Sequence, residues 1–231
     1  MRGNAISALG GSEVRILHLP LCAGKTANES LPTGRQVTLT AKDVRTTFKC
    51  MPVAITYFVH GTTTDNENGI SSGWFDAELS ALGIKQSIAL KNKMKNKKFD
   101  VIFCSDLKRA VNSAKLTFEG MAPIIPDARL RECNYGTYNA KPSSIVEPMA
   151  EKNITERFPE GESYEDVKTR IADFLKFLKQ NYEGKSVALV AHKAPQLALD
   201  VLLKGKTWEN AFAEDWRKTR SWQPGWEYNV P

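Results

Sequence analysis

The sequence predicts an α/β fold of three layers, in which a mostly parallel β-sheet is covered by helices on both faces. Short apolar runs of strand length alternate with longer segments whose apolar residues recur at the spacing of a helix face. The most apolar run, residues 186–191, has the continuous apolar character of a strand buried on both faces. The chain is 42% hydrophobic and 25% charged, and no apolar run approaches the roughly 18 residues of a membrane span. We therefore expect a single soluble globular domain.

The first predicted elements are two strands with a helix between them. Residues 53–58 and residues 100–104 are apolar runs of strand length. We expect Ser80 to cap a helix that reaches about Lys95. No aromatic residues alternate with the lysines near the end of this helix, so we expect a solvated helix end rather than a nucleic-acid-binding surface. These lysines are Lys91, Lys93, Lys95, Lys97 and Lys98.

Further helices are predicted from capping residues that precede apolar residues at helical spacing. We expect Asp106 to cap one helix, and Ser163 with Asp166 to form a capping box at the start of another. The apolar face of the first consists of Leu107, Ala110, Val111, Ala114 and Phe118. That of the second consists of Val167, Ile171, Phe174, Leu175 and Leu178. Pro195 is expected in the first turn of a later helix.

The C-terminal region is rich in tryptophan. Its four tryptophans are Trp208, Trp216, Trp222 and Trp226, and they are interleaved with Arg217, Lys218 and Arg220. Aromatic rings beside cations can stack on a base or a sugar. We favour the alternative that they close a small core, and we expect residues 225–230 to add a last strand.

Residues 1–50 differ from the rest of the chain. They carry a net charge of +4 out of +6, contain one aromatic residue and show no sustained periodicity. We interpret them as a disordered extension, a transit segment or a misassigned start, and residues 51–231 as the domain.

The four cysteines are scattered without a Cys-x-x-Cys pair, which argues against a disulfide scaffold or a structural zinc site. A reducing, cytoplasmic location is therefore expected, with organellar import through residues 1–50 as the alternative.

Three residues with phosphate chemistry follow predicted strands. His60 and His192 come directly after apolar strands, and Arg109 lies in the first turn of a predicted helix. Ligands of parallel sheets bind at the carboxyl ends of the strands. Two imidazoles and a guanidinium at that edge suit a phosphoryl group, because one imidazole can attack while the cation and helix amides hold the oxygens. A single histidine at a strand end is more often structural, so the joint placement carries the prediction.

The residues around these groups resemble the motifs of the histidine phosphatase superfamily, also called phosphoglycerate mutase-like. Residues 59–66 are similar to the family's Arg-His-Gly-x-Thr-x-x-Asn motif, and residues 105–110 to its Ser-x-Leu-x-Arg-Ala motif. Residues 73–83 resemble Gly-Trp-x-Asp followed by Leu-Thr-x-x-Gly, and residues 130–136 resemble Leu-x-Glu-x-x-x-Gly. Gly161-Glu162-Ser163 with Asp166 and Arg170, and then Val190-Ala191-His192, complete the order over about residues 53–204.

The resemblance implies a phosphoglycerate mutase-like fold and a phosphomonoesterase that acts on a small phosphorylated metabolite. By this resemblance His60 is the nucleophile that becomes phosphohistidine, and Glu132 protonates the leaving oxygen and later activates water. Arg109 and His192 would bind the phosphoryl oxygens, and the resemblance places Gly61, Thr63 and Asn66 around the same group. No metal or organic cofactor is implied. The alternative for Glu132 is a surface residue paired with Arg129 or Arg131.

Two positions depart from the family pattern. Val59 stands where the first motif has arginine, and Lys193 stands where a small residue usually follows the second histidine. The Lys193 ammonium either reaches the phosphate pocket or points to solvent. A non-catalytic phospholigand-binding or scaffolding protein is therefore the alternative function, and a phosphoglycerate mutase is less favoured. We expect a small phosphorylated substrate as partner, no nucleic acid or membrane, and a monomer or homodimer.

Overall fold

A five-stranded sheet forms the centre of the protein. The computed structural model describes residues 51–219 and 225–231. The strands are β1 (Val53–Val59), β3 (Val101–Cys104), β4 (Ile124–Pro126), β6 (Ser186–Ala191) and β7 (Trp226–Val230). Their order is β4-β3-β6-β1-β7, and all neighbouring pairs are parallel except β1 with β7. Residues 1–50 lie outside the described residues, so their separation from a domain at 51–231 stays a prediction.

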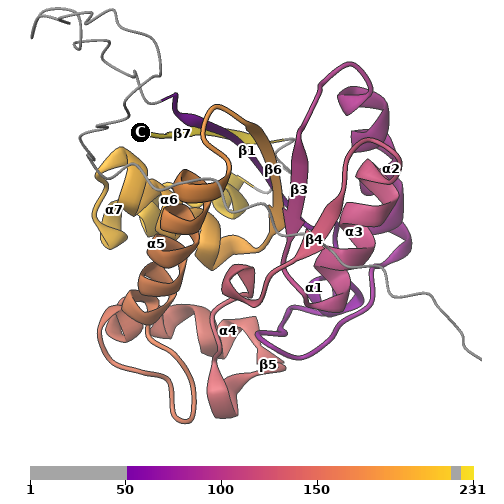
Figure 1. The fold of residues 1–231 in the computed structure, drawn as a ribbon. Coiled ribbons are helices and arrows are strands. Elements are labelled where there is room, and N and C mark those ends of the chain that lie inside the picture. Colours follow the sequence, from indigo (N-terminus) through magenta and orange to yellow (C-terminus); the bar gives the residue numbers. More distant parts are fainter. Residues whose placement is uncertain (1–50, 220–224) are drawn as a thin grey trace, which may run out of the picture. The chain divides into compact units, whose positions relative to one another are not determined.

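Helices cover both faces of this sheet. The helices α2 (Ala81–Met94) and α3 (Lys108–Phe118) lie on one face, and α5 (Tyr164–Asn181), α6 (Lys193–Lys204) and α7 (Trp208–Ala213) lie on the other (Figure 1). Each layer buries its own apolar cluster against the sheet. The predicted three-layer α/β fold with a mostly parallel sheet is confirmed.

Short elements gather where β1 ends. The strand β1 leads into α1 (Thr64–Glu67), and a small antiparallel sheet pairs β2 (Ile70–Ser71) with β5 (Lys141–Pro142). The strand β5 lies with α4 (Ser143–Val146) at the lower end of the molecule (Figure 1). The 3₁₀ turns are η1 (Ala128–Leu130), η2 (Gly136–Tyr138), η3 (Glu147–Met149), η4 (Lys152–Ile154) and η5 (Trp216–Thr219).

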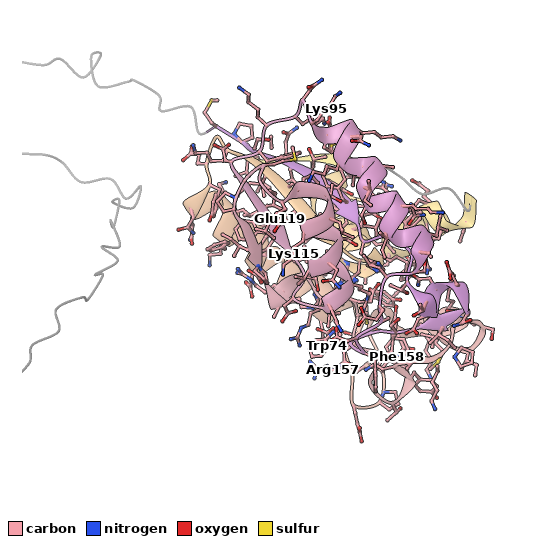
Figure 2. All side chains as sticks on the ribbon, turned by 90° about the vertical axis from the view of Figure 1, so that its right-hand side faces the viewer. Trp74, Lys95, Lys115, Glu119, Arg157 and Phe158 are labelled. Carbon is pink, nitrogen blue, oxygen red and sulfur yellow. The ribbon has the colours of Figure 1, made fainter. Side chains whose placement is uncertain are left out.

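Most of the predicted caps and faces are confirmed. The Ser80 hydroxyl accepts the N–H of Gly83 at the start of α2, and Ser163 forms the capping box of α5 with Asp166. The five predicted apolar residues of α5 are all buried. The lysines at the end of α2 are exposed, and Figure 2 shows Lys95 at the opposite end of the molecule from Trp74. No helix in the described part of the chain is long and apolar enough to cross a membrane.

The predicted cap at Asp106 is wrong. The helix α3 begins after Leu107, and the Asp106 carboxylate instead accepts two hydrogen bonds from Arg131, at 2.7 and 2.6 Å. Asp76, from the loop before α2, accepts the N–H of Lys108 at 2.9 Å and so serves the start of α3. A guanidinium that binds both carboxylate oxygens outcompetes a local cap, because charge-assisted paired hydrogen bonds are stronger.

Trp208 and Trp226 pack in the main core rather than in a separate small one. Trp208 is buried, and its ring lies 5.4 Å from that of Tyr164 and 5.7 Å from that of Phe212. Trp226 lies in β7, and its ring centroid is 5.8 Å from that of Trp216. Trp222 lies outside the described residues. The predicted last strand is confirmed as β7, which pairs with β1.

Candidate active site

The two histidines leave the sheet side by side. The strands β1 and β6 are parallel neighbours, with Val59 opposite Ala191, so the next residue of each strand is a histidine. The N–H of His60 donates to the carbonyl oxygen of Ala191 at 3.0 Å. The imidazole centroids of His60 and His192 are 5.0 Å apart, with an angle of 62° between the rings. The structure therefore brings together the two imidazoles that the sequence placed at one sheet edge.

The imidazole of His60 is neutral and held in one orientation. Its Nδ1 lies 2.7 Å from the carbonyl oxygen of Gly61. A carbonyl oxygen only accepts, so the assigned proton of the neutral ring is on Nδ1 and Nε2 keeps its lone pair. Burial and then the nearby Arg109 guanidinium lower the pKa of His60 to about 3. The ring can therefore act as a nucleophile through Nε2 at neutral pH.

His192 is fully buried, and its ring has no hydrogen-bond partner. Neither ring nitrogen finds a donor or an acceptor among the described residues. Its backbone is fixed by Tyr57, whose hydroxyl donates to the His192 carbonyl at 2.6 Å and accepts the His192 N–H at 3.0 Å. Burial, with Arg109 and His60, holds the pKa of His192 well below its usual value. Because buried polar groups normally have partners, this ring suits a site that receives a ligand oxygen.

Arg109 supplies a buried guanidinium in the first turn of α3. Its side chain is 2% exposed and donates to the carbonyl oxygens of Phe75, at 2.8 Å, and Gly73, at 2.7 Å. Burial lowers its pKa, and the charge of Glu132 opposes that effect. The two carbonyls orient the guanidinium without neutralising it, so its remaining N–H groups can bind an anion.

The Glu132 carboxylate lies at the start of α6. Its Oε1 accepts the N–H groups of Ala194, at 3.0 Å, and Cys133, at 2.9 Å, and its Oε2 accepts the N–H of Lys193 at 3.2 Å. The side chain is buried next to the helix that His192 precedes. Glu132 therefore serves amides at the N-terminus of α6 that would otherwise lack acceptors.

The surface pairing considered for Glu132 is wrong. Arg129 binds Asp127 and Arg131 binds Asp106, so neither guanidinium pairs with Glu132. The backbone carbonyl of Glu132 accepts from Trp74 Nε1 at 2.7 Å and from Arg170 at 2.9 Å. These bonds fix the main chain beneath the carboxylate.

The residues after His60 build a tight turn rather than a row of free phosphate ligands. The N–H of Gly61 donates to Ser113 Oγ at 3.0 Å, and a Cβ at this position would lie 2.5 Å from the Gly83 oxygen. Only glycine fits this close approach. Thr63 is buried as the N-cap of α1, whereas Asn66 is exposed and its Oδ1 accepts the N–H of Thr63 at 3.0 Å.

The two residues that the sequence analysis marks as departures from the family pattern are both buried. Val59, the last residue of β1, is 6% exposed. Lys193 is 8% exposed, so the solvent-facing alternative for this side chain is wrong. Its ammonium lies 3.8 Å from Asp215 Oδ2.

Sequence reasoning missed Tyr57 and Asp215. Alternation along β1 places Tyr57 on the buried face with Val53 and Ile55. Because a buried tyrosine hydroxyl needs a hydrogen-bond partner, this alternation could have indicated Tyr57. No local pattern points to Asp215, because its partner Lys193 comes from a distant helix.

A surface cavity of about 450 Å³ is lined by residues that contact the site, but not by His60, Arg109, Glu132 or His192 themselves. Its wall includes Trp74 and Phe75, from the segment whose carbonyls hold Arg109, and Asn134, two residues after Glu132. The lining is Trp74, Phe75, Asp76, Asn134, Gly136, Thr137, Asn139 and Glu160. In the described residues, no group of three or more His, Cys, Asp and Glu side chains could hold a metal ion.

The fold and this site define a class of α/β proteins with paired histidines and a buried arginine at the carboxyl edge of a parallel sheet. Residues 57–223 match the family model of the histidine phosphatase superfamily, branch 1. The chain belongs to this superfamily, and the resemblance of its motifs is confirmed.

Relatives and solved structures fit this assignment. A Hydrogenobacter thermophilus protein named as a phosphoserine phosphatase is 31% identical over 65% of this chain and 78% of its own. The fructose-2,6-bisphosphatase TIGAR of Xenopus tropicalis is 35% identical over 54% of this chain, a match that spans 49% of that relative. The structure of a mycobacterial glucosyl-3-phosphoglycerate phosphatase superposes with a TM-score of 0.62 at 26% identity, and the match covers 70% of this chain and 84% of that chain.

Proposed function

We propose that the protein is a phosphomonoesterase that hydrolyses a small phosphorylated metabolite through a phosphohistidine at His60. The observation that carries the proposal is the neutral His60 ring, which donates through Nδ1, with its centroid 5.0 Å from that of His192, whose ring has no hydrogen-bond partner among the described residues. Membership of the histidine phosphatase superfamily and the phosphatase names of the relatives support it. The surface cavity has a volume that suits the remainder of a small metabolite.

The proposed reaction has two balanced steps. His60 Nε2 attacks phosphorus and the ester P–O bond breaks, so the alcohol leaves with a proton and the phosphoryl group stays on the ring. Water then attacks phosphorus, the P–N bond breaks and phosphate is released. Arg109 and the His192 ring would hold the equatorial oxygens during both steps, because they present N–H groups in a buried, weakly screened place.

Glu132 is the proposed acid and base of these steps. In this role Glu132 starts as the protonated acid, gives that proton to the leaving oxygen, and as the carboxylate later takes one from the attacking water. The carboxylate is occupied by three backbone N–H groups, so proton delivery requires that it exchange at least one of them for the leaving oxygen. The same contacts also serve a simpler role, in which Glu132 only anchors the start of α6.

The proposal is tested with the purified full chain and a panel of phosphomonoesters. We expect phosphate release by the wild type and none above background by His60→Ala. His18→Ala is the matched control, since it removes the third histidine of the chain, and it should keep wild-type turnover. Equal turnover of His60→Ala and the wild type would contradict the nucleophile assignment.

A non-catalytic phospholigand-binding protein is the second candidate. It is favoured by one observation, the apolar Val59 beside the candidate nucleophile where the family motif has arginine. Arginine contacts can contribute about 10³- to 10⁵-fold to phosphoryl-transfer rates. Binding of phosphorylated ligands in a calorimeter without any hydrolysis would establish this alternative.

A further inference from the structure

Lys193 belongs to a charged network that none of the proposed chemical steps uses. Lys193 Nζ lies 3.8 Å from Asp215 Oδ2, and the same oxygen accepts from Arg217 Nη2 at 3.0 Å. The backbone N–H of Arg217 donates to Asp215 Oδ1 at 3.0 Å, and Arg217 Nη1 lies 2.8 Å from Glu147 Oε1. We call Lys193, Asp215, Arg217 and Glu147 the Lys193 network. It joins three segments that are far apart in the sequence.

The charges of this network balance one another. Lys193 and Asp215 are 8% and 6% exposed, and each would be costly to bury without an opposite charge. Burial and the neighbouring Arg217 lower the pKa of Lys193, while Asp215 opposes them. Burial acts to raise the pKa of Asp215, but Lys193 and Arg217 outweigh it and hold that pKa below its usual value. The carboxylate of Asp215 therefore stands between two cations.

The backbone of Lys193 contacts the candidate site. Its backbone N–H and that of Ala194 both donate to the Glu132 carboxylate, and the residue before it is His192. The side chain and the backbone of one residue thus connect Asp215 to the first turn of α6. The Lys193 ammonium faces Asp215, in the C-terminal segment, and forms its ion pair there.

We propose that Lys193 is a positioning residue for the reaction, and not a phosphate ligand. Its ion pair with Asp215 holds the first turn of α6 in place, so that Glu132 keeps its amide partners and His192 stays beside His60. The segment that carries Asp215 and Arg217 is thereby part of the catalytic assembly. This inference rests on the proposed function, because its readout includes turnover.

The ion pair is tested by a double-mutant cycle on stability, which needs no turnover. We compare Lys193→Met, Asp215→Asn and the double variant by urea unfolding. Asp215→Asn leaves Lys193 buried beside Arg217 with its counterion removed, so we expect its unfolding equilibrium constant to rise at least about tenfold more than that of Lys193→Met. The double variant should be more stable than Asp215→Asn. Additive effects of the two changes would overturn the pairing, and if Asp215→Asn fails to fold, the recovery of a folded double variant carries the same information.

The positioning role is tested by kinetics with p-nitrophenyl phosphate and by inhibition with orthovanadate. We expect Lys193→Met to lower kcat at least about fivefold while the inhibition constant for orthovanadate stays within about twofold. Lys185→Met is the matched control, since it breaks an exposed ion pair with Asp100, and it should leave both values unchanged. A tenfold weaker binding of orthovanadate by Lys193→Met would make Lys193 a phosphate ligand and overturn the proposal, as would an unchanged kcat.

The two proposals fail in different ways. A wild-type protein that hydrolyses no phosphomonoester contradicts the proposed function and, with it, the positioning role. An active wild type whose Lys193→Met variant is equally active contradicts the positioning role alone.

Discussion

The carboxyl ends of β1 and β6 lie side by side and each is followed by a histidine, but the two histidines have different surroundings. At the end of β1 the His60 ring is partly exposed and donates through Nδ1 to the carbonyl of Gly61. At the end of β6 the His192 ring is fully buried and has no hydrogen bond to any described residue. Within the described residues, the first ring has a fixed tautomer with one nitrogen without a partner, whereas the second has two such nitrogens and a backbone fixed by Tyr57.

In the proposed mechanism this difference assigns attack on phosphorus to His60 and binding of the phosphoryl oxygens to His192. A nucleophile needs a defined lone pair that substrate can reach, whereas a binding ring gains most when its unsatisfied nitrogen is buried until the ligand arrives.

The two strand ends also differ in the charges around them. Val59 and Gly61 flank His60 without charge, whereas Lys193 follows His192 and Glu132 accepts from the first turn of α6. The positive charge at the β1 end therefore comes from Arg109, on a different element.

The largest expected effects come from exchanging each histidine for alanine. We expect His60→Ala to lower kcat/KM for p-nitrophenyl phosphate by roughly 10⁴-fold or more, because the covalent route is lost. His192→Ala should lower it less, by roughly 10² to 10³, because one binding donor is lost. Steady-state kinetics of both variants measure this order, and a larger loss in His192→Ala would reverse the two assignments.

Replacing Glu132 by glutamine separates its two roles at the β6 end. If Glu132 delivers the proton, turnover should fall most for esters with poor leaving groups, by about 10²-fold, and least for p-nitrophenyl phosphate. The nitrophenolate leaves with little need for a proton, which makes it the internal control. A uniform loss across leaving groups would show that Glu132 only anchors α6.

A positive charge added at the β1 end should raise activity. In Val59→Arg a guanidinium would lie beside the candidate phosphoryl site, and we expect kcat/KM to rise at least about tenfold, which corresponds to about 1.4 kcal/mol of transition-state stabilisation. Val59→Leu is the matched control for volume without charge. A fall in activity with Val59→Arg but not with Val59→Leu would show that the pocket is built around its apolar residue.

The low pKa of His60 predicts a pH dependence of stability. The folded state binds a proton on this ring only near pH 3, whereas the unfolded chain binds it near pH 6.5. The stability contribution is therefore complete above about pH 6.5 and is lost as the pH falls towards 3. Urea unfolding at pH 7.5, 5.5 and 4.5 should show a smaller acid loss for His60→Gln than for the wild type. Identical pH profiles would mean that the folded and unfolded chains titrate this ring alike.

Much of the fold and the pairing of the histidines could be predicted from the sequence, because the relevant signals are local. Apolar runs mark β1 and β6, and the residue after a buried parallel strand lies at the ligand-binding edge whatever its partners are. Capping at Ser80 and Ser163 was equally readable, since each hydroxyl and its amide partner are three residues apart.

Contacts between distant segments could not be predicted in the same way. The local sequence predicts Asp106 as an N-cap, but its carboxylate accepts two hydrogen bonds from Arg131, which lies in a later turn. The position of Lys193 after His192 predicts a phosphate ligand or a solvated lysine, and neither interpretation predicts its ion pair with Asp215. Periodicity and caps report the neighbours along one element, whereas these ion pairs depend on how elements pack.

The different roles of the two strand ends are tested most directly by trapping the phosphorylated protein. The full chain is mixed with a labelled phosphomonoester, quenched under alkaline conditions that preserve phosphohistidine, and mapped by peptide mass spectrometry. We predict label on His60 in the wild type, label on His60 at a reduced level in His192→Ala, and none in His60→Ala. Label on His192, or an equal amount of label in His60→Ala and the wild type, would contradict the account.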